Sequence, residues 1–83
     1  MNDDTNNMPV VNAGYTPGGG QWFRRTRDGR EFFTTTQALG CWACTDPDGV
    51  KHDGWHSHVY YHFSDGTVAK TWKQLVAHIE AAE

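Results

Sequence analysis

The stretch Trp55-His-Ser-His-Val-Tyr-Tyr-His-Phe63 decides the fold of this 83-residue chain, because a strand and a helix over these residues lead to different architectures. Its β-branched and aromatic residues favour an extended backbone. In a strand, successive side chains point to opposite faces. We therefore predict a strand over residues 55–63 whose core face carries Trp55, Ser57, Val59, Tyr61 and Phe63. The opposite face then presents His56, His58, Tyr60 and His62 to solvent, a metal or a partner.

A β-hairpin is expected before this strand. Asp28-Gly29 separates two runs rich in aromatic and β-branched residues, 22–27 and 30–36. A two-residue Asp-Gly turn, with positive φ at both positions, typically joins such runs. The residues that follow are ambiguous, since Thr36 can cap a short helical turn that Gly40 ends. Further along, Ser64-Asp65-Gly66 predicts a second hairpin turn, with a short returning strand over residues 67–70.

The C-terminal residues carry the signature of an amphipathic helix. Thr71-Trp-Lys-Gln74 has the form of a capping box, in which two side chains satisfy backbone N–H groups at a helix start. Apolar residues then recur at helical spacing, namely Trp72, Leu75, Val76 and Ile79. The predicted fold class is α+β, a small antiparallel sheet of four or five strands packed by one C-terminal amphipathic helix.

Residues 21–83 are expected to form this single domain, and residues 1–20 a disordered N-terminal tail. The tail is polar, contains Gly18-Gly19-Gly20 and lacks an apolar period. Such composition does not offset the entropy lost on ordering a segment. Val10, Val11 and Tyr15 leave open a short edge strand docked on the domain.

Both cysteines and four of the five histidines lie within the 22 residues from Cys41 to His62. A two-residue gap lets Cys41 and Cys44 bind one ion across a tight turn. The spacing to His58 and His62 matches a finger-type zinc site, but four residues of strand would place those two rings about 13 Å apart. His56 and His58, two apart on one strand face, are near enough to share an ion. The predicted structural zinc ligands are therefore Cys41, Cys44, His56 and His58.

Other states of the cysteines remain open at this point. They can be ordinary free thiols, because a reduced cysteine behaves as a small hydrophobe, or they can form a local disulfide. A redox pair is disfavoured, since no βαβ unit precedes Cys41. The cofactor expectation is accordingly either none or one structural zinc.

Four of the seven basic residues lie in the first hairpin, beside several aromatic residues. Arginine and tryptophan dominate the energetics of protein interfaces. The candidate partner-binding residues are Trp22, Arg24, Arg25, Arg27, Arg30 and Phe32. Guanidinium groups also bind phosphates and stack on bases, so nucleic acid is the alternative partner, although a net charge of −3 disfavours strong non-specific binding to it.

Part of this hairpin resembles the first half of the WW-domain signature. The resemblance covers about 20 of 83 residues and is carried by Trp22, Gly29-Arg30, Phe32-Phe33 and Trp42. The chain has Thr34 where that signature has a histidine, and the proline expected soon after the second tryptophan comes only at Pro47. The resemblance implies binding of a proline-rich peptide through Phe33 and Trp42.

Catalysis is not expected. Histidines 56, 58 and 62 and the nearby turn aspartates 46, 48 and 53 are titratable, but the chain has no nucleophile motif, phosphate-binding glycine loop or dinucleotide fingerprint. It also lacks the run of about 18 apolar residues that a membrane span needs, and an apolar leader. We therefore expect a cytoplasmic, non-catalytic binding module, a small accessory or regulatory protein that engages a protein through the arginine hairpin. The alternatives are a nucleic-acid-binding domain and a structural zinc module.

Overall fold

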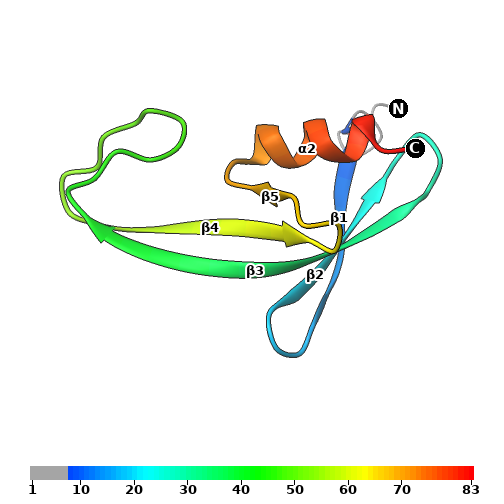
Figure 1. Cartoon of the computed structure of the whole chain (residues 1–83), viewed down its shortest axis with the longest axis horizontal. Helices are drawn as coiled ribbons and strands as arrows, with labels where there is room; N and C mark the ends of the chain where they lie inside the picture. Colours follow the sequence, from blue (N-terminus) through cyan, green and yellow to red (C-terminus); the bar gives the residue numbers. More distant parts are fainter. Residues whose placement is uncertain (1–7) are drawn as a thin grey trace, which may run out of the picture.

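The computed structural model describes residues 8–83. Within this part, five strands form one antiparallel sheet in chain order, and one helix, α2 (Trp72–Ala81), follows them (Figure 1). The predicted α+β class is confirmed. The strands are β1 (Val10–Thr16), β2 (Gly20–Arg25), β3 (Glu31–Trp42), β4 (Trp55–Phe63) and β5 (Val68–Ala69).

Strand β1 corrects the expectation of a disordered tail through residue 20. It pairs antiparallel with β2, with Val10 opposite Arg25, and the Val10 side chain is fully buried. Gly18 and Gly19 have φ values of +85° and +92°, so the glycine run forms the turn between the two strands. The rest of the predicted tail, residues 1–7, lies outside the described residues.

The β2–β3 hairpin is confirmed, but its turn differs from the prediction. The Arg25 N–H donates to the Arg30 carbonyl, and the Gly29 N–H donates to the Arg25 carbonyl, both at 2.8 Å. These bonds enclose a four-residue loop, 26–29, in which Gly29 has a φ of +75° and Asp28 does not have a positive φ. The Asp28 side chain instead accepts the Arg30 N–H, which stabilises the longer loop.

Strand β3 extends further than expected. Residues 37–39 do not form the helical turn that Thr36 was predicted to cap, because β3 pairs with β4 without interruption from Thr34 opposite Phe63 to Trp42 opposite Trp55. The strand predicted over residues 55–63 is confirmed as β4.

The hydrophobic core lies where α2 covers the sheet. Leu75 and Ile79 of the helix are fully buried, and with them Val10, Phe23, Phe63 and Ala69 form the core. The capping box is confirmed at Thr71, whose hydroxyl accepts the Gln74 N–H at 3.1 Å. The Gln74 side chain in turn accepts a backbone N–H at 2.9 Å, from Lys70.

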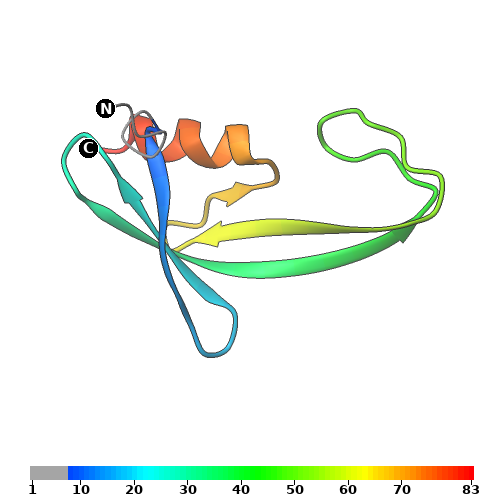
Figure 2. The ribbon, with the colours of Figure 1, turned by 180° about the vertical axis from the view of Figure 1, so that it is seen from behind.

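Beyond the helix, the distal parts of β3 and β4 and their connection extend as an arm, defined here as residues 37–59 (Figures 1 and 2). The predicted core face of β4 is therefore only half right. Phe63 is buried and Tyr61 packs against the core, but Val59 and Trp55 are 42% and 70% exposed. No helix or strand among residues 8–83 covers them, because α2 lies over the sheet only as far as β5.

We expect Leu75→Ala to lower the free energy of unfolding by about 2–5 kcal/mol, because it opens a cavity under the helix. Urea denaturation monitored by circular dichroism measures the change. Lys73→Ala, at an exposed position of the same helix, is the control. Equal effects of the two substitutions would contradict this placement of the core.

Candidate metal centre

The arm has no apolar interior. None of its residues is fully buried, and most are exposed. Apart from Gly54, its partly buried residues are all of types that bind metals: Cys41, Cys44, Asp46, His52, His56 and His58. These six polar side chains therefore occupy the place that apolar side chains take in an ordinary hairpin interior.

Three of them converge at the end of β3. The His58 Nε2 atom lies 3.0 Å from the Cys41 Sγ and 3.5 Å from the Cys44 Sγ. The two cysteines form a disulfide, with Cα atoms 6.1 Å apart. The turn between them contains Ala43, the only described non-glycine residue with positive φ, at +52°. This conformation is uncommon for alanine, and it brings both sulfur atoms to the same side of the turn beside His58.

The connection between β3 and β4 supplies a second group. It folds back on itself through a bridge between Thr45 and Lys51. One Asp46 carboxylate oxygen accepts the N–H groups of Asp48 and Val50, and the other lies 2.9 Å from the His52 Nε2. The hydrogen bond with His52 and that from the Val50 N–H lower the pKa of Asp46 below its ordinary value. Asp46 is therefore held as a fixed, ionised carboxylate.

His56 belongs to this second group. Its ring stacks on that of His52, with centroids 3.5 Å apart and planes 7° apart. Its pKa is lowered, first by burial and then by the neighbouring His52 and His58, so the neutral imidazole that binds metals is favoured. The His56 and His58 ring centroids are 4.5 Å apart, which makes the two groups neighbours.

The structure thus brings together three of the four predicted zinc ligands, Cys41, Cys44 and His58. It places the fourth, His56, beside Asp46 and His52, two ligand candidates that the sequence analysis missed. The turn-forming residues between Asp46 and His52 could have indicated them, because such a turn brings the chain back toward the end of β3. His62 lies apart, 2.8 Å from the Gln37 side-chain oxygen, so the finger-type pairing of His58 with His62 does not form.

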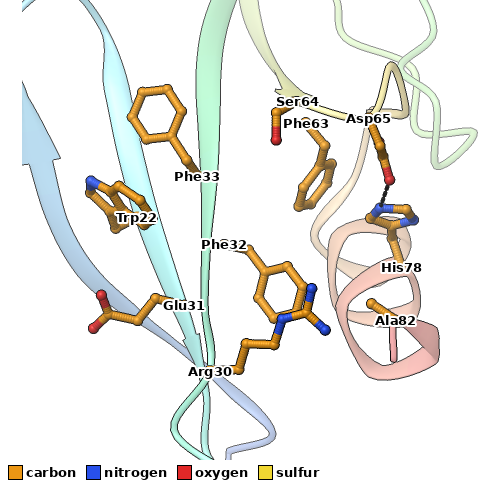
Figure 3. Close-up of a pocket in the computed structure, with 10 residues that line it drawn as sticks. All are labelled: Trp22, Arg30, Glu31, Phe32, Phe33, Phe63, Ser64, Asp65, His78 and Ala82. Atoms are coloured by element: carbon orange, nitrogen blue, oxygen red, sulfur yellow. Dashed lines mark ion pairs between the residues drawn. The ribbon is translucent and has the colours of Figure 1, made fainter.

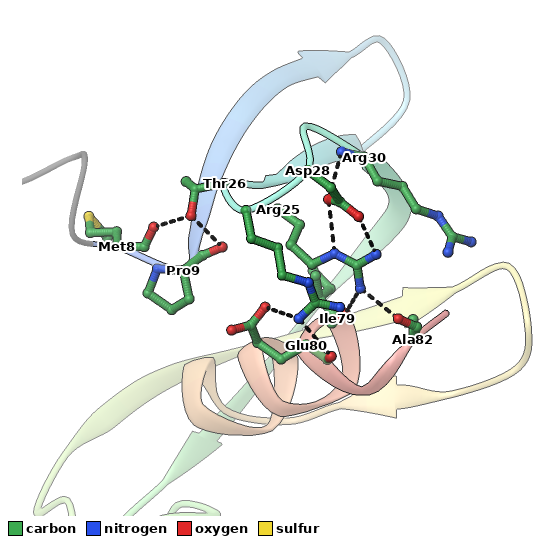
Figure 4. A network of polar contacts seen from close by, with 10 residues as sticks. Met8, Pro9, Arg25, Thr26, Asp28, Arg30, Ile79, Glu80 and Ala82 are labelled. Carbon is green, nitrogen blue, oxygen red and sulfur yellow. Dashed lines mark hydrogen bonds and ion pairs between the residues drawn. The ribbon is translucent and has the colours of Figure 1, made fainter.

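The arginine hairpin is organised differently from the prediction. Arg25 is only 2% exposed, and its guanidinium donates to the carbonyls of Ile79 and Ala82 at the end of α2, both at 2.6 Å (Figure 4). Two further bonds join it to the Asp28 carboxylate. Its assignment to a partner-binding surface is wrong, because this side chain fills a structural role inside the fold.

The other predicted partner-binding residues do not share one surface. Trp22 and Arg24 lie on the face of β2 away from Phe23 and the core, whereas Phe32 lies opposite Phe23 on the helix side. Arg27 reaches the Glu80 carboxylate at 3.1 Å (Figure 4). Two more contacts engage the remaining arginines: Arg24 lies 3.7 Å from Glu31, and Arg30 stacks 4.7 Å over Phe32.

A cavity of about 310 Å³ lies between this hairpin and the end of α2 (Figure 3). Aromatic side chains line it, including Phe32 and Phe63. Its charged groups have partners within the protein, since Asp65 pairs with His78 at 2.9 Å and Arg30 covers Phe32. The charged side chains of the cavity are therefore already engaged within the protein.

The structure does not support the peptide groove implied by the WW resemblance. Phe33 and Trp42 both lie on β3, nine residues apart, which corresponds to about 30 Å of strand. Phe33 packs on Trp22 near the first hairpin, with ring centroids 5.0 Å apart. Two side chains so placed cannot line one short groove.

Comparison with known proteins gives no further assignment: no family model, curated protein or solved structure matches the chain. Among residues 8–83, no helix has the length and apolar character needed to cross a membrane.

The Asp28–Arg25 pair predicts a pH dependence of stability. The hydrogen bond from Arg25 lowers the pKa of Asp28 to about 2. A carboxyl group with a depressed folded-state pKa stabilises the fold fully above its unfolded pKa, about 4, and this contribution is lost as the pH falls to about 2. Asp28→Asn should remove this part of the acid destabilisation, measured as the free energy of urea unfolding between pH 7 and 2.

The control for this experiment is Glu83→Gln, at an exposed C-terminal position. It should keep the acid-dependent loss of the unmodified chain. Identical profiles for Asp28→Asn and the unmodified chain would show that the pair does not stabilise the fold.

Proposed function

We infer that the protein is a small, non-catalytic binding module whose arm is held by one zinc ion bound to Cys41, Cys44 and His58. The observation that carries this proposal is the interior of the arm, which consists of metal-binding residue types instead of apolar ones. An isolated two-stranded hairpin is marginally stable in water, and small domains often gain stability from a metal. Two cysteine sulfurs and one imidazole nitrogen are ligands that zinc prefers.

The zinc-bound form requires the reduced cysteines. A metal binds thiolates, so the disulfide between Cys41 and Cys44 and the zinc complex are alternative forms of the same turn. Reduction releases two sulfur ligands that the turn at Ala43 already holds beside His58. A fourth ligand, from water or from a further side chain, completes a tetrahedral site.

The binding surface that this arm presents consists of two tryptophans. Trp42 and Trp55 are opposite each other in the β3–β4 pairing and are 72% and 70% exposed. They share a face of the arm, while the next pair, Cys41 and His56, lies on the other face. Exposed tryptophans at such a position are typical of protein contacts. We assign a protein partner to this face, since Arg25 is buried and the three exposed arginines each contact an acidic or aromatic side chain of the same chain.

Zinc binding is tested with cobalt(II), which gives a thiolate-to-cobalt absorption band only when cysteine sulfur binds the metal. In protein reduced with a phosphine, the band should saturate at one equivalent. Loss of a residue that only orients a metal ligand typically weakens metal binding by roughly 10–100-fold. Cys41→Ser and His58→Ala remove ligands themselves, so each should weaken cobalt binding by more than this. His62→Ala, which removes a histidine outside the cluster, should leave the band unchanged. Absence of the band in reduced protein would refute the zinc site.

Partner binding is tested by affinity capture from extracts of the cells that make the protein, with zinc present. The unmodified chain should retain a protein that the Trp42→Ala/Trp55→Ala variant does not retain. The matched control is Trp22→Ala/Arg24→Ala, which alters the exposed part of the first hairpin and should retain it. If instead the hairpin variant loses the partner and the tryptophan variant keeps it, the partner binds the first hairpin. If nuclease treatment abolishes capture, the partner is a nucleic acid.

A further inference from the structure

The arm contains a second group of ligands that the zinc proposed above does not use. Asp46, His52 and His56 each offer one ligand atom, and these atoms all lie within 4.8 Å of one another. All three side chains are partly buried. The group comes from two elements, with Asp46 and His52 on the connection and His56 on β4.

From this convergence we propose that the arm binds a second divalent cation, held by Asp46, His52 and His56 beside the thiolate site. One carboxylate and two imidazoles suit borderline first-row ions such as zinc or cobalt(II), with water at the remaining positions. The second site is independent of the first, because the two share no ligand.

The carboxylate of this site is already positioned. One Asp46 oxygen accepts two backbone N–H groups, at 3.0 Å from Asp48 and 2.9 Å from Val50, which fixes the carboxylate plane. Metal-binding carboxylates are commonly oriented by hydrogen bonds of this kind. The other oxygen faces His52 and is the one available to a cation.

The two imidazoles need only side-chain rotation. In the structure the rings of His52 and His56 stack in parallel, so their nitrogen lone pairs do not meet at one point. A turn of each ring out of the stack aims one nitrogen from each toward the Asp46 carboxylate. The backbone of both residues is held in place: the His52 N–H donates to the Cys44 carbonyl, and His56 pairs with Cys41.

Charge favours a cation at this position. Residues 46–53 contain three aspartates and one lysine, a net charge of −2. In the thiolate site, two cysteine thiolates already balance the charge of their own ion. A second divalent cation on the connection would balance the charge of residues 46–53, whereas an empty site leaves Asp46 compensated only by hydrogen bonds and by His52.

The competing arrangement has a single centre in which His56 is the fourth ligand of the thiolate site. This is the main alternative because the His56 and His58 ring centroids are only 4.5 Å apart, so both rings could bind the same ion. The two arrangements differ in stoichiometry and in the effect of His56 on the thiolate site, and both can be measured.

The experiment uses the untagged, phosphine-reduced full chain, freed of metal by chelation and titrated with cobalt(II). Native mass spectrometry counts the bound ions, and the thiolate-to-cobalt band reports the first site alone. We expect two bound ions. Asp46→Asn and His52→Ala should each lose one ion with the band unchanged, and Cys41→Ser should lose the band and keep one ion. His62→Ala, as the control, should keep both.

One bound ion with an intact thiolate band would overturn the second site while leaving the zinc proposal in place. A weaker thiolate band in His56→Ala would also overturn it, because His56 would then belong to the first centre. A third outcome is possible, in which the unmodified chain binds one ion, Asp46→Asn binds none, and no protein shows the thiolate band. This result would support the second site and refute the first.

Discussion

The limited reach of the helix is the constraint on which the rest of the structure depends. The ten residues of α2 span about 15 Å, whereas the twelve residues of β3 span about 40 Å. One helix of this length can bury only one end of the sheet. In the part of the chain that the structure describes, the sheet beyond the helix has no second layer, so apolar burial does not stabilise the arm. Every distinctive feature of residues 37–59, from the exposed tryptophans to the polar interior, follows from this lack of cover.

A short helix must itself be held in place, and Arg25 does this. Its guanidinium donates to two carbonyls at the end of α2, where the last carbonyls lack the usual i+4 N–H partner. The Ile79 carbonyl also accepts a longer bond, of 3.3 Å, from the Ala82 N–H at the C-cap. A positive charge there also interacts favourably with the helix dipole. Arg27 adds a contact to Glu80 one residue away from this point. Two of the four basic residues predicted to form a recognition surface, Arg25 and Arg27, therefore link the first hairpin to the last element of the chain.

Local patterns in the sequence were sufficient to predict β4, the β2–β3 hairpin and the capped helix, because alternation, turn residues and helical spacing act within a few residues. Non-local contacts were not predictable in this way. Val10, Val11 and Tyr15 left a short edge strand open, but β1 has an irregular register between Asn12 and Gly14, and only its pairing with β2 distinguishes it from a disordered tail. Alternation placed Trp55 and Val59 on one face but could not show that nothing covers it. Asp46 and His52 meet His56 only because the connection folds back.

The zinc site proposed for the arm would also determine which way its tryptophans face. A slip of one residue between paired strands moves every side chain to the opposite face, and burial prevents such slips only where one face is covered. Among residues 8–83, no apolar layer covers either face of the arm, and what packs on it is the folded-back connection, through His52 stacked on His56. Ligands that must meet on one face impose the register instead, because a slip would carry Cys41 away from His58. The same register sets Trp42 opposite Trp55 on the other face. In the proposed metal-bound form, metal binding and presentation of the tryptophan pair are thus two consequences of one strand alignment.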